Sequence, residues 1–343
     1  MKTILIKKIC FIALCVIALT GCEKRFGEGV TLKDIEVEPT VRVIINEMSR
    51  AKAFPIPWDC TNYTFTWTSS NPAIATVDDF GRVSAHAFGD CTITVSSGGI
   101  SKQIKVDVYD PPLAERLAPF NVKYLFEFND PNNLFKPTIG TNSLEPIGSG
   151  FKQVDGYNAE TKAIHIPTSD RNDAGEWINH LFLNHGFRAN GGGALVNQIT
   201  IMLDIKVPAG GGDRALYNTK FYPTSKIAWA DAGCFVRNAG AFGFNGINSS
   251  DNMVQRDVWY RLVMCANFGN TVTYFRNGDK VLTNTTSSSI DWDGRAWPLD
   301  GVVLFTDAAN RNNVNEVIVA TLAIWYRCLL DSEVASLGLL RLN

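Results

Sequence analysis

Apolar residues recur at every second position through much of this 343-residue chain. From residue 198 to 207, for example, Ile199, Ile201 and Leu203 share one side, and more polar residues take the other. This period of two is typical of β-strands, whose successive side chains point to opposite faces of a sheet. Turn-forming pairs such as Asn71-Pro72 separate the alternating runs. The sequence therefore predicts an all-β protein.

The composition limits the function classes that the chain can serve. Hydrophobic residues make up 45% and charged residues 19%, which is enough apolar material for packed cores and excludes a disordered chain. The formal net charge of −2 offers no basic field for nucleic acid, so we expect no nucleic-acid partner. Only four histidines occur, which leaves little for histidine-based catalysis.

The first 21 residues have the pattern of a secretory signal peptide. Lysines at the start precede an apolar run from Ile9 to Leu19, which is short for a membrane span. The following Leu19-Thr20-Gly21-Cys22 resembles a bacterial lipobox. That resemblance implies a lipid on Cys22, a short tether over residues 22–28, and anchoring to the outer membrane or elsewhere in the cell envelope. Whether the protein faces the periplasm or the outside is left open.

Five cysteines remain after the signal peptide and Cys22 are set aside: Cys60, Cys91, Cys234, Cys265 and Cys328. An odd number at irregular spacing makes a poor disulfide framework and contains no C-x-x-C pair. We expect cysteines on apolar strand faces to act as small buried hydrophobic residues. A bridge between Cys60 and Cys91 remains an alternative, because oxidation is permitted outside the cytoplasm.

Residues 29–109 predict a small β-sandwich of short strands. Phe65 and Trp67 lie on one strand face between threonines, and the stretch 65–83 continues through Asn71-Pro72 and Gly81. Together with 89–95, this stretch resembles the bacterial Ig-like domain of group 2. The resemblance implies a spacer or adhesion module without a catalytic site. Prolines in residues 110–119 predict an extended linker.

Residues 120–343 predict a second, larger all-β domain. The segments 125–130, 163–167, 196–204, 259–263, 304–307 and 323–329 together resemble the concanavalin A-like, laminin G-type jelly roll. Asn277-Gly278 predicts a hairpin turn, 317–326 a central strand, and 332–337 a short helix that Asp331 would cap. The family resemblance implies a fold shared by lectins, adhesins, glycan-binding modules and inert supports.

No catalytic motif is complete. The jelly-roll glycosidases carry two carboxylates on one strand in a Glu-x-Asp-x-x-Glu run, which is absent here. The segment 289–297 approaches the sialidase aspartate box but has Trp292 in place of its aspartate. The sequence therefore favours a protein that is not an enzyme, and an uncharacterised glycan hydrolase is kept as an alternative.

The loop 287–301 holds the residues best suited to bind a sugar: Trp292, Asp293, Arg295 and Trp297. Indole rings stack on the C–H faces of sugars, and charged groups bond the hydroxyls. The alternative, in which the tryptophans cover the edge of the sandwich, stays open. Trp259 and Trp325 lie within apolar strands and are expected to pack in the core.

A structural calcium ion is the other candidate ligand. Asp307 and Asn310 stand in an oxygen-rich loop, and Asp130 could join them if the first and last strands are neighbours. A solvated, asparagine-rich turn is the alternative, because few carboxylates are present.

These observations combine into one hypothesis: a lipid-anchored, extracytoplasmic binding protein that recognises a glycan or glycoprotein through jelly-roll loops. The alternative is a protein-interaction or adhesion subunit of an envelope complex, which an extensive exposed apolar patch would favour.

Overall fold

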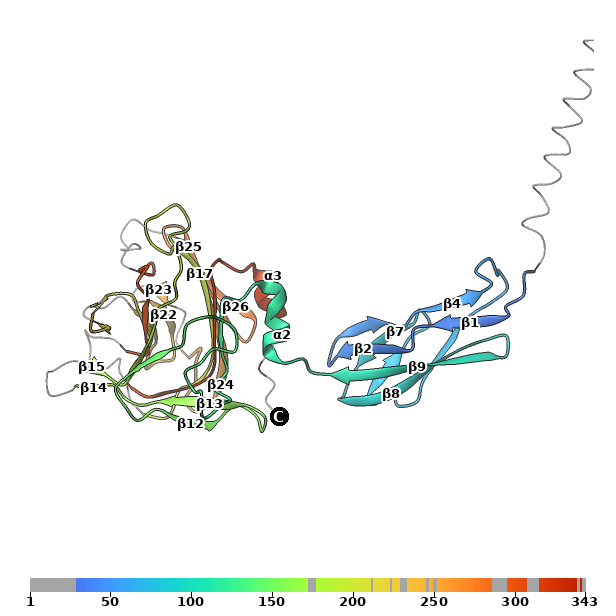
Figure 1. The fold of residues 1–343 in the computed structure, drawn as a ribbon, viewed down its shortest axis with the longest axis horizontal. Helices are drawn as coiled ribbons and strands as arrows, with labels where there is room; N and C mark the ends of the chain where they lie inside the picture. The colour runs from blue at the N-terminus through green and yellow to red at the C-terminus, as the bar shows by residue number, and fades with distance from the viewer. Residues whose placement is uncertain are drawn as a thin grey trace, which may run out of the picture. The chain divides into compact units, whose positions relative to one another are not determined.

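The computed structural model describes residues 29–171, 177–210, 212–222, 224–228, 233–244, 247–248, 252–285, 295–306, 315–337 and 340. The chain forms two compact units, Met1–Pro112 and Leu113–Asn343, which we call the first and second units (Figure 1). Strands make up most of the regular secondary structure described in both units, so the all-β fold class is confirmed.

The first unit is a sandwich of a four-stranded sheet, in the order β2-β9-β8-β5, and a three-stranded sheet, β3-β7-β6, with β1 and β4 paired beside them. Strand β2 runs parallel to β9, and the other pairs are antiparallel. The strands are β1 Asp34–Val37, β2 Thr40–Ile44, β3 Met48–Arg50, β4 Ala53–Ile56, β5 Thr66–Ser69, β6 Ala75–Val77, β7 Arg82–Ala85, β8 Gly89–Ser97 and β9 Ile100–Tyr109.

Small aliphatic side chains fill the core of the first unit. Alternate residues of β8 and β9, such as Ile93 and Val106, are fully buried between the sheets. The buried cluster contains only valine, isoleucine, alanine and cysteine. Larger aromatic side chains therefore lie at the edges and surface of this unit.

The structure differs from the predicted extended linker between the units. Helix α2 (Leu113–Leu117) and the 3₁₀ turn η2 (Ala118–Phe120) follow Pro112. Leu113 and Leu117 are buried in a hydrophobic cluster of the second unit. Burial of these two leucines stabilises a helix too short to persist alone, which the proline count did not reveal.

The second unit contains two large sheets. One has the order β12-β13-β28-β17-β24-β25-β26, with β10 also paired to β28, and the other is β11-β16-β27-β18-β21-β22-β23. Its strands are β10 Tyr124–Phe126, β11 Glu145–Ile147, β12 Lys152–Asp155, β13 Lys162–Ile166, β14 Asp170–Arg171, β15 Trp177–Ile178, β16 His180–Leu183, β17 Gln198–Lys206, β18 Arg214–Asn218, β19 Phe221–Tyr222, β20 Ile227–Ala228, β21 Gly233–Val236, β22 Phe242–Phe244, β23 Ile247–Asn248, β24 Trp259–Asn267, β25 Thr271–Arg276, β26 Asp279–Thr285, β27 Val302–Leu304 and β28 Val317–Trp325.

The core of the second unit draws on both sheets and is rich in aromatic rings. Strand β28 is buried along nearly its whole length. It pairs with β17 on one side and with β13 and β10 on the other, which confirms the predicted central strand. Asn277 and Gly278 both have positive φ, at 51° and 85°, between β25 and β26, which confirms the predicted hairpin turn. Trp325 is fully buried and Trp259 nearly so, as expected from their strands.

A buried ion pair joins strands β17 and β24 of the larger sheet, and its arginine also bonds to the residue that follows the C-terminal helix α3 (Asp331–Ser336). Arg261 donates two hydrogen bonds to the carboxylate of Asp204, at 2.7 and 2.8 Å, and a third to the carbonyl of Leu337. The N-cap of α3 is Leu330, not the predicted Asp331, because the Glu333 side chain accepts the Leu330 backbone N–H. Asp331 instead pairs with Lys280.

Candidate functional site

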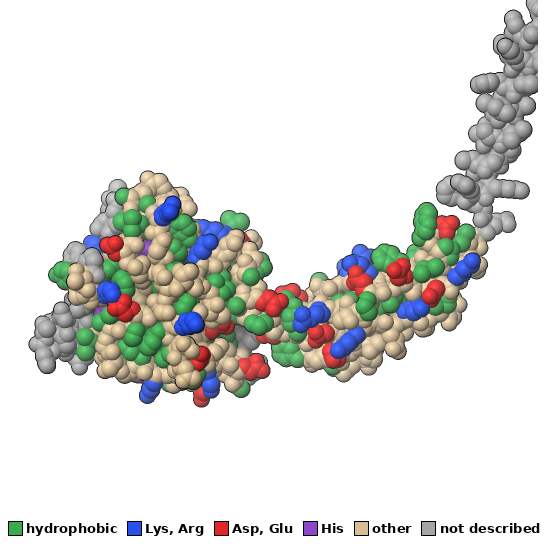
Figure 2. Space-filling view, viewed as in Figure 1, with side chains coloured by type: hydrophobic (Ala, Val, Ile, Leu, Met, Phe, Trp, Pro, Cys, Tyr) green, Lys and Arg blue, Asp and Glu red, His purple; other side chains and the backbone are tan. Residues whose placement is uncertain are grey.

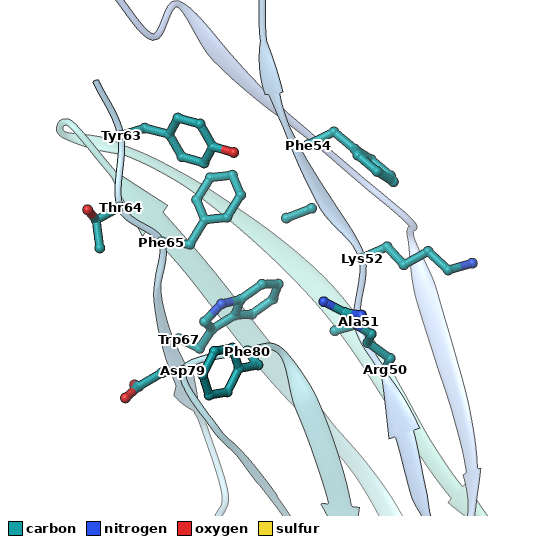
Figure 3. Close-up of a pocket in the computed structure, with 11 residues that line it drawn as sticks. Arg50, Ala51, Lys52, Phe54, Tyr63, Thr64, Phe65, Trp67, Asp79 and Phe80 are labelled. Atoms are coloured by element: carbon teal, nitrogen blue, oxygen red, sulfur yellow. The ribbon is translucent and has the colours of Figure 1, made fainter. Parts of the chain in front are cut away.

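The first unit contains an open groove of about 720 Å³ lined by aromatic and charged side chains (Figure 3). We call it the aromatic groove. Its lining residues are Arg50, Ala51, Lys52, Ala53, Phe54, Tyr63, Thr64, Phe65, Trp67, Asp79 and Phe80.

One wall of the groove is a row of three aromatic rings that leads into β5. Tyr63, Phe65 and Trp67 alternate with threonines, so an extended backbone places all three rings on the same side. The ring centroids of Tyr63 and Phe65 are 4.8 Å apart, and those of Phe65 and Trp67 are 6.2 Å apart in an edge-to-face arrangement. These contacts hold the rings as one continuous surface.

The opposite wall comes from β3, β4 and the residues between them. Arg50, Lys52 and Phe54 belong to this wall, and Phe54 is 54% exposed. Figure 3 shows the Phe54 ring and the Lys52 chain directed away from the aromatic row. Ala51 and Ala53 alternate with these side chains. Because alanine carries only a methyl group, the space between the two walls stays open.

The turn between β6 and β7 closes one end of the groove with Asp79 and Phe80. The Asp78 carboxylate accepts hydrogen bonds from the backbone N–H of Arg82 and of Phe80, both at 2.9 Å. The bond from the Arg82 backbone is the main cause that lowers the pKa of Asp78 below its ordinary value. The turn is thereby held in the shape that presents Phe80, which is 69% exposed.

Gly81 is required next to this turn. Its φ of +75° is unfavourable for other residues, and a Cβ there would lie 2.7 Å from the Ala51 carbonyl oxygen and 3.0 Å from the Trp67 ring. The glycine therefore allows the Trp67 ring to lie close to the turn. Trp67 has a structural role as well as a place in the groove wall.

The polar groups of the groove are largely free to bind a ligand. Lys52 pairs with Glu38 at 2.8 Å. Among the described residues, the guanidinium of Arg50, the carboxylate of Asp79 and the hydroxyl of Tyr63 have no hydrogen-bond partner. The groove thus combines exposed aromatic faces with a cation, an anion and a hydroxyl.

The sequence predicted that Phe65 and Trp67 share one strand face, but not that this face lines a groove. The structure leaves both only partly buried. The aromatic row from Tyr63 to Trp67 was the available signal, because a domain of about 80 residues has a small core that cannot hold several large rings. Phe54 and Phe80 come from separate segments and had no local signal.

Trp297, which was predicted to contact a ligand, is buried instead. It has no exposed surface and belongs to the main core cluster. Its ring lies 5.4 Å from that of Tyr217 and 5.5 Å from that of His185, and its backbone pairs with Val196. This position corrects the ligand-binding prediction for Trp297 in favour of the packing alternative, because the burial of a large ring is strongly favourable.

Of the other members of that predicted site, only Arg295 belongs to the described residues. Arg295 is partly buried, with its guanidinium 5.0 Å above the Phe244 ring. Trp292 and Asp293 lie outside the described residues.

The predicted calcium ligands are described only in part. Asp130 accepts hydrogen bonds from the backbone N–H of Asn132 at 2.9 Å and from the side chain of Asn133 at 2.7 Å. The Asn133 side chain is the main cause that lowers the pKa of Asp130 below its ordinary value. Asp307 and Asn310 lie outside the described residues. Within the described part of the chain, no three His, Cys, Asp or Glu residues come together as metal ligands.

The titratable groups of the second unit are mostly structural. Burial lowers the pKa of both His180 and His185 to about 4, and each ring nitrogen Nε2 lies 2.9 Å from a backbone carbonyl oxygen. All five cysteines that remain after Cys22 are free thiols, so Cys60 and Cys91 are not bridged in the structure.

Comparison with known proteins supports the assignment of the first unit. Residues 32–108 match the family model of the bacterial Ig-like domain of group 2, in agreement with the predicted resemblance. No curated protein matches the sequence. In the part of the chain that the structure describes, no helix has the length and hydrophobicity needed to cross a membrane.

Several solved structures are similar at low sequence identity. The binding domain of Paraclostridial Mosquitocidal Protein 1 is 18% identical, with 66% of this chain and 52% of that chain covered and a TM-score of 0.44. Domain 4 of AbnA, an extracellular arabinanase from Geobacillus stearothermophilus in complex with arabinotriose, is 14% identical, with coverages of 63% and 98% and a TM-score of 0.38. The botulinum neurotoxin serotype D binding domain is 12% identical, with coverages of 64% and 51% and a TM-score of 0.43. This chain thus spans about half the length of the first and third of these.

Proposed function

We propose that the protein is a lipid-anchored, extracytoplasmic binding protein that recognises carbohydrate through the aromatic groove. The observation that carries the proposal is the groove itself, an open surface where aromatic rings from three separate segments surround unpartnered polar groups. Its volume of about 720 Å³ is within the range of small-ligand sites.

The chemistry of the groove suits sugar rings. The C–H faces of a sugar stack on aromatic faces such as those of Tyr63 and Phe80, while its hydroxyls bond to charged and polar groups. Arg50 donates hydrogen bonds, and Asp79 accepts them. A groove open to solvent along its length would admit an internal stretch of a polysaccharide as well as its end.

The groove supports binding without chemical conversion. Among the described residues that line it, Asp79 is the one carboxylate, whereas glycoside hydrolysis ordinarily uses a pair of carboxylates. A site with one exposed carboxylate and several aromatic faces can hold a glycan but lacks the carboxylate pair that most glycosidases use.

The anchor part of the proposal is supported by Leu19-Thr20-Gly21-Cys22. An acylated Cys22 would hold the protein in the cell envelope, because each buried methylene adds about 0.8 kcal/mol to membrane binding. Metabolic labelling with an alkyne fatty acid should mark the wild-type protein and leave Cys22→Ser unlabelled. An unlabelled wild-type chain would remove the anchor from the proposal.

Glycan binding is tested by affinity gel electrophoresis on a panel of polysaccharides together with a glycan array. Phe80→Ala and Tyr63→Ala should each weaken the binding of a retained glycan roughly tenfold, since one aromatic contact contributes about 1 kcal/mol or more. Phe88→Ala is the matched control, because Phe88 is an exposed aromatic residue of the same unit outside the groove. If the wild type is retarded on no polysaccharide, or if groove variants bind like the wild type, carbohydrate recognition by the groove is wrong.

A protein ligand is the second candidate, and the sheet topology favours it at the same place. Strands β5 and β3 are each the end strand of their sheet, and both adjoin the groove. An extended peptide can add to such an edge through backbone hydrogen bonds. Peptide binding that Tyr63→Ala abolishes, in a protein that binds no glycan, would support this adhesion function instead.

A further inference from the structure

One end of the first unit carries exposed hydrophobic side chains on two neighbouring segments. Trp58 is 87% exposed, and Val30 and Ile56 are exposed as well. Figure 2 shows hydrophobic side chains on the surface at the end where the chain enters this unit. We call Val30, Ile56 and Trp58 the apolar tip.

Backbone contacts place these three residues together at the point of chain entry. The backbone N–H of Lys33 donates to the carbonyl of Ile56 at 2.7 Å, and Asp34 pairs with Ile56 at the start of β1. Thr31 forms a bridge with Asn62, on the other side of the turn that bears Trp58. The segment of Val30 therefore lies beside the segment of Trp58.

The turn that carries Trp58 is held firmly although its side chain is exposed. The backbone N–H of Cys60 donates to the carbonyl of Pro57 at 3.0 Å, which closes the turn, and the Cys60 side chain is buried. A tryptophan fixed at the apex of a closed turn presents nearly its whole ring outward. A free indole in water is unfavourable, which indicates that another phase or partner covers it.

The length of chain before the tip indicates what covers it. Cys22 precedes Gly29, the first described residue, by seven positions. Seven extended residues reach at most about 25 Å. A lipid on Cys22 would therefore hold the apolar tip close to the membrane surface.

The chemistry of the tip also matches the membrane interface. Tryptophan prefers the headgroup region, where its ring is partly buried and its N–H can still bond to water. Exposed Lys33 and Asp59 flank the tip with opposite charges, so apolar insertion and not charge attraction would dominate. A second copy of the chain is a poorer match, because a stable dimer buries about 20–30 residues on each side.

We infer that the apolar tip inserts into the headgroup region of the bilayer and fixes the first unit against the membrane; this inference rests on the lipid anchor of the proposed function. None of the three tip residues lines the aromatic groove. The anchor then supplies attachment, and the tip supplies orientation.

The test holds the protein at a bilayer without using Cys22. The chain 23–343, which keeps every described residue, carries an N-terminal hexahistidine tag bound to a nickel-chelating lipid. The vesicles are mixtures of phosphatidylethanolamine and phosphatidylglycerol, with or without brominated acyl chains that quench nearby tryptophan. Because the tether replaces the acyl group, the result does not depend on whether Cys22 is acylated or whether the groove binds a glycan.

We expect brominated lipid to quench part of the tryptophan emission of the wild type. The emission of Trp58→Phe should not show this quenching. The matched control is the double variant Trp58→Phe/Phe88→Trp, which moves the indole from position 58 to position 88. Phe88 is 52% exposed and directly precedes the start of β8, where Gly89 pairs with Val108. This variant should show no such quenching. Equal quenching of the wild type and Trp58→Phe would overturn the inference. So would a dimer of the untethered chain, found by analytical ultracentrifugation, that Trp58→Ala dissociates.

Discussion

The two units place the same residue types in opposite environments. In the first unit, Phe54, Trp58 and Phe80 are among the exposed large hydrophobic residues, whereas in the second unit Trp297 and Trp325 are fully buried. Both units are β-sandwiches with alternating strands. The difference lies in the number of strands that enclose each core.

Core composition explains the contrast. The first unit closes on valine, isoleucine and alanine, and its largest rings have no interior volume to occupy. The second unit packs sheets of eight and seven strands, and its core holds many phenylalanine, tyrosine and tryptophan side chains. An exposed aromatic residue is therefore a better indication of a ligand site in a small sandwich than a loop tryptophan is in a large one.

The largest predicted effect concerns Trp297. Trp297→Ala should destabilise the second unit by about 3–5 kcal/mol, because it leaves a large cavity in the core. Urea unfolding of the whole chain, followed by circular dichroism, measures this loss in the transition of the second unit. A loss below about 1 kcal/mol would contradict the packing role and restore Trp297 as a candidate for ligand contact.

Removal of one partner of the buried ion pair should have a comparable effect. Asp204→Asn leaves the charge of Arg261 uncompensated in the core and should cost about 3–5 kcal/mol. The exposed pair of Arg42 and Asp107 in the first unit is the control, and Asp107→Asn should cost no more than about 1 kcal/mol. If Asp204→Asn and Asp107→Asn lower the free energy of unfolding equally, burial does not determine how much these ion pairs contribute to stability.

Mild acid should separate the units without any mutation. His180 and His185 titrate at about 4 in the folded second unit, against an ordinary value of 6.5, because burial lowers their pKa. Between these values the unfolded chain binds protons that the folded unit does not, so the free energy of unfolding falls as the pH falls. At pH 5 the loss should be about 2 kcal/mol for each histidine.

Calorimetry at pH 7 and pH 5 measures this difference. The first unit is the internal comparison, because neither of the two buried histidines belongs to it. In the second unit, burial raises the pKa of Glu127, which opposes part of the loss near the lower end of the range. If the unfolding temperatures of both units fall equally between pH 7 and pH 5, the two buried histidines are not the cause of the loss.

The smallest stability effects should come from the exposed rings of the first unit. Phe80→Ala and Trp58→Ala should each change the free energy of unfolding by less than about 0.5 kcal/mol, because little of either ring is buried. Thermal unfolding provides the measurement. A loss of several kcal/mol on Phe80→Ala would show that the groove is part of the core, and its binding role would then need another basis.

Local features of the fold could be predicted from the sequence. The alternation in β17 and β8, the Asn277-Gly278 turn and the apolar run of β28 each depend on neighbouring residues, and the structure confirms them. The connector was predicted wrongly, because the burial of Leu113 depends on contacts with distant residues of the second unit.

The candidate site was less predictable for the same reason. The sequence favoured Trp297 because it stands in a loop, but the loop turns its ring toward Tyr217 in the core. The aromatic groove draws on three separate segments, which only the pairing of β3, β4 and β5 with their neighbours brings together. Periodicity in the chain determines which side chains share a face of a strand. Whether that face meets another sheet or water was decided by the tertiary structure alone, because burial depends on partners far away in sequence.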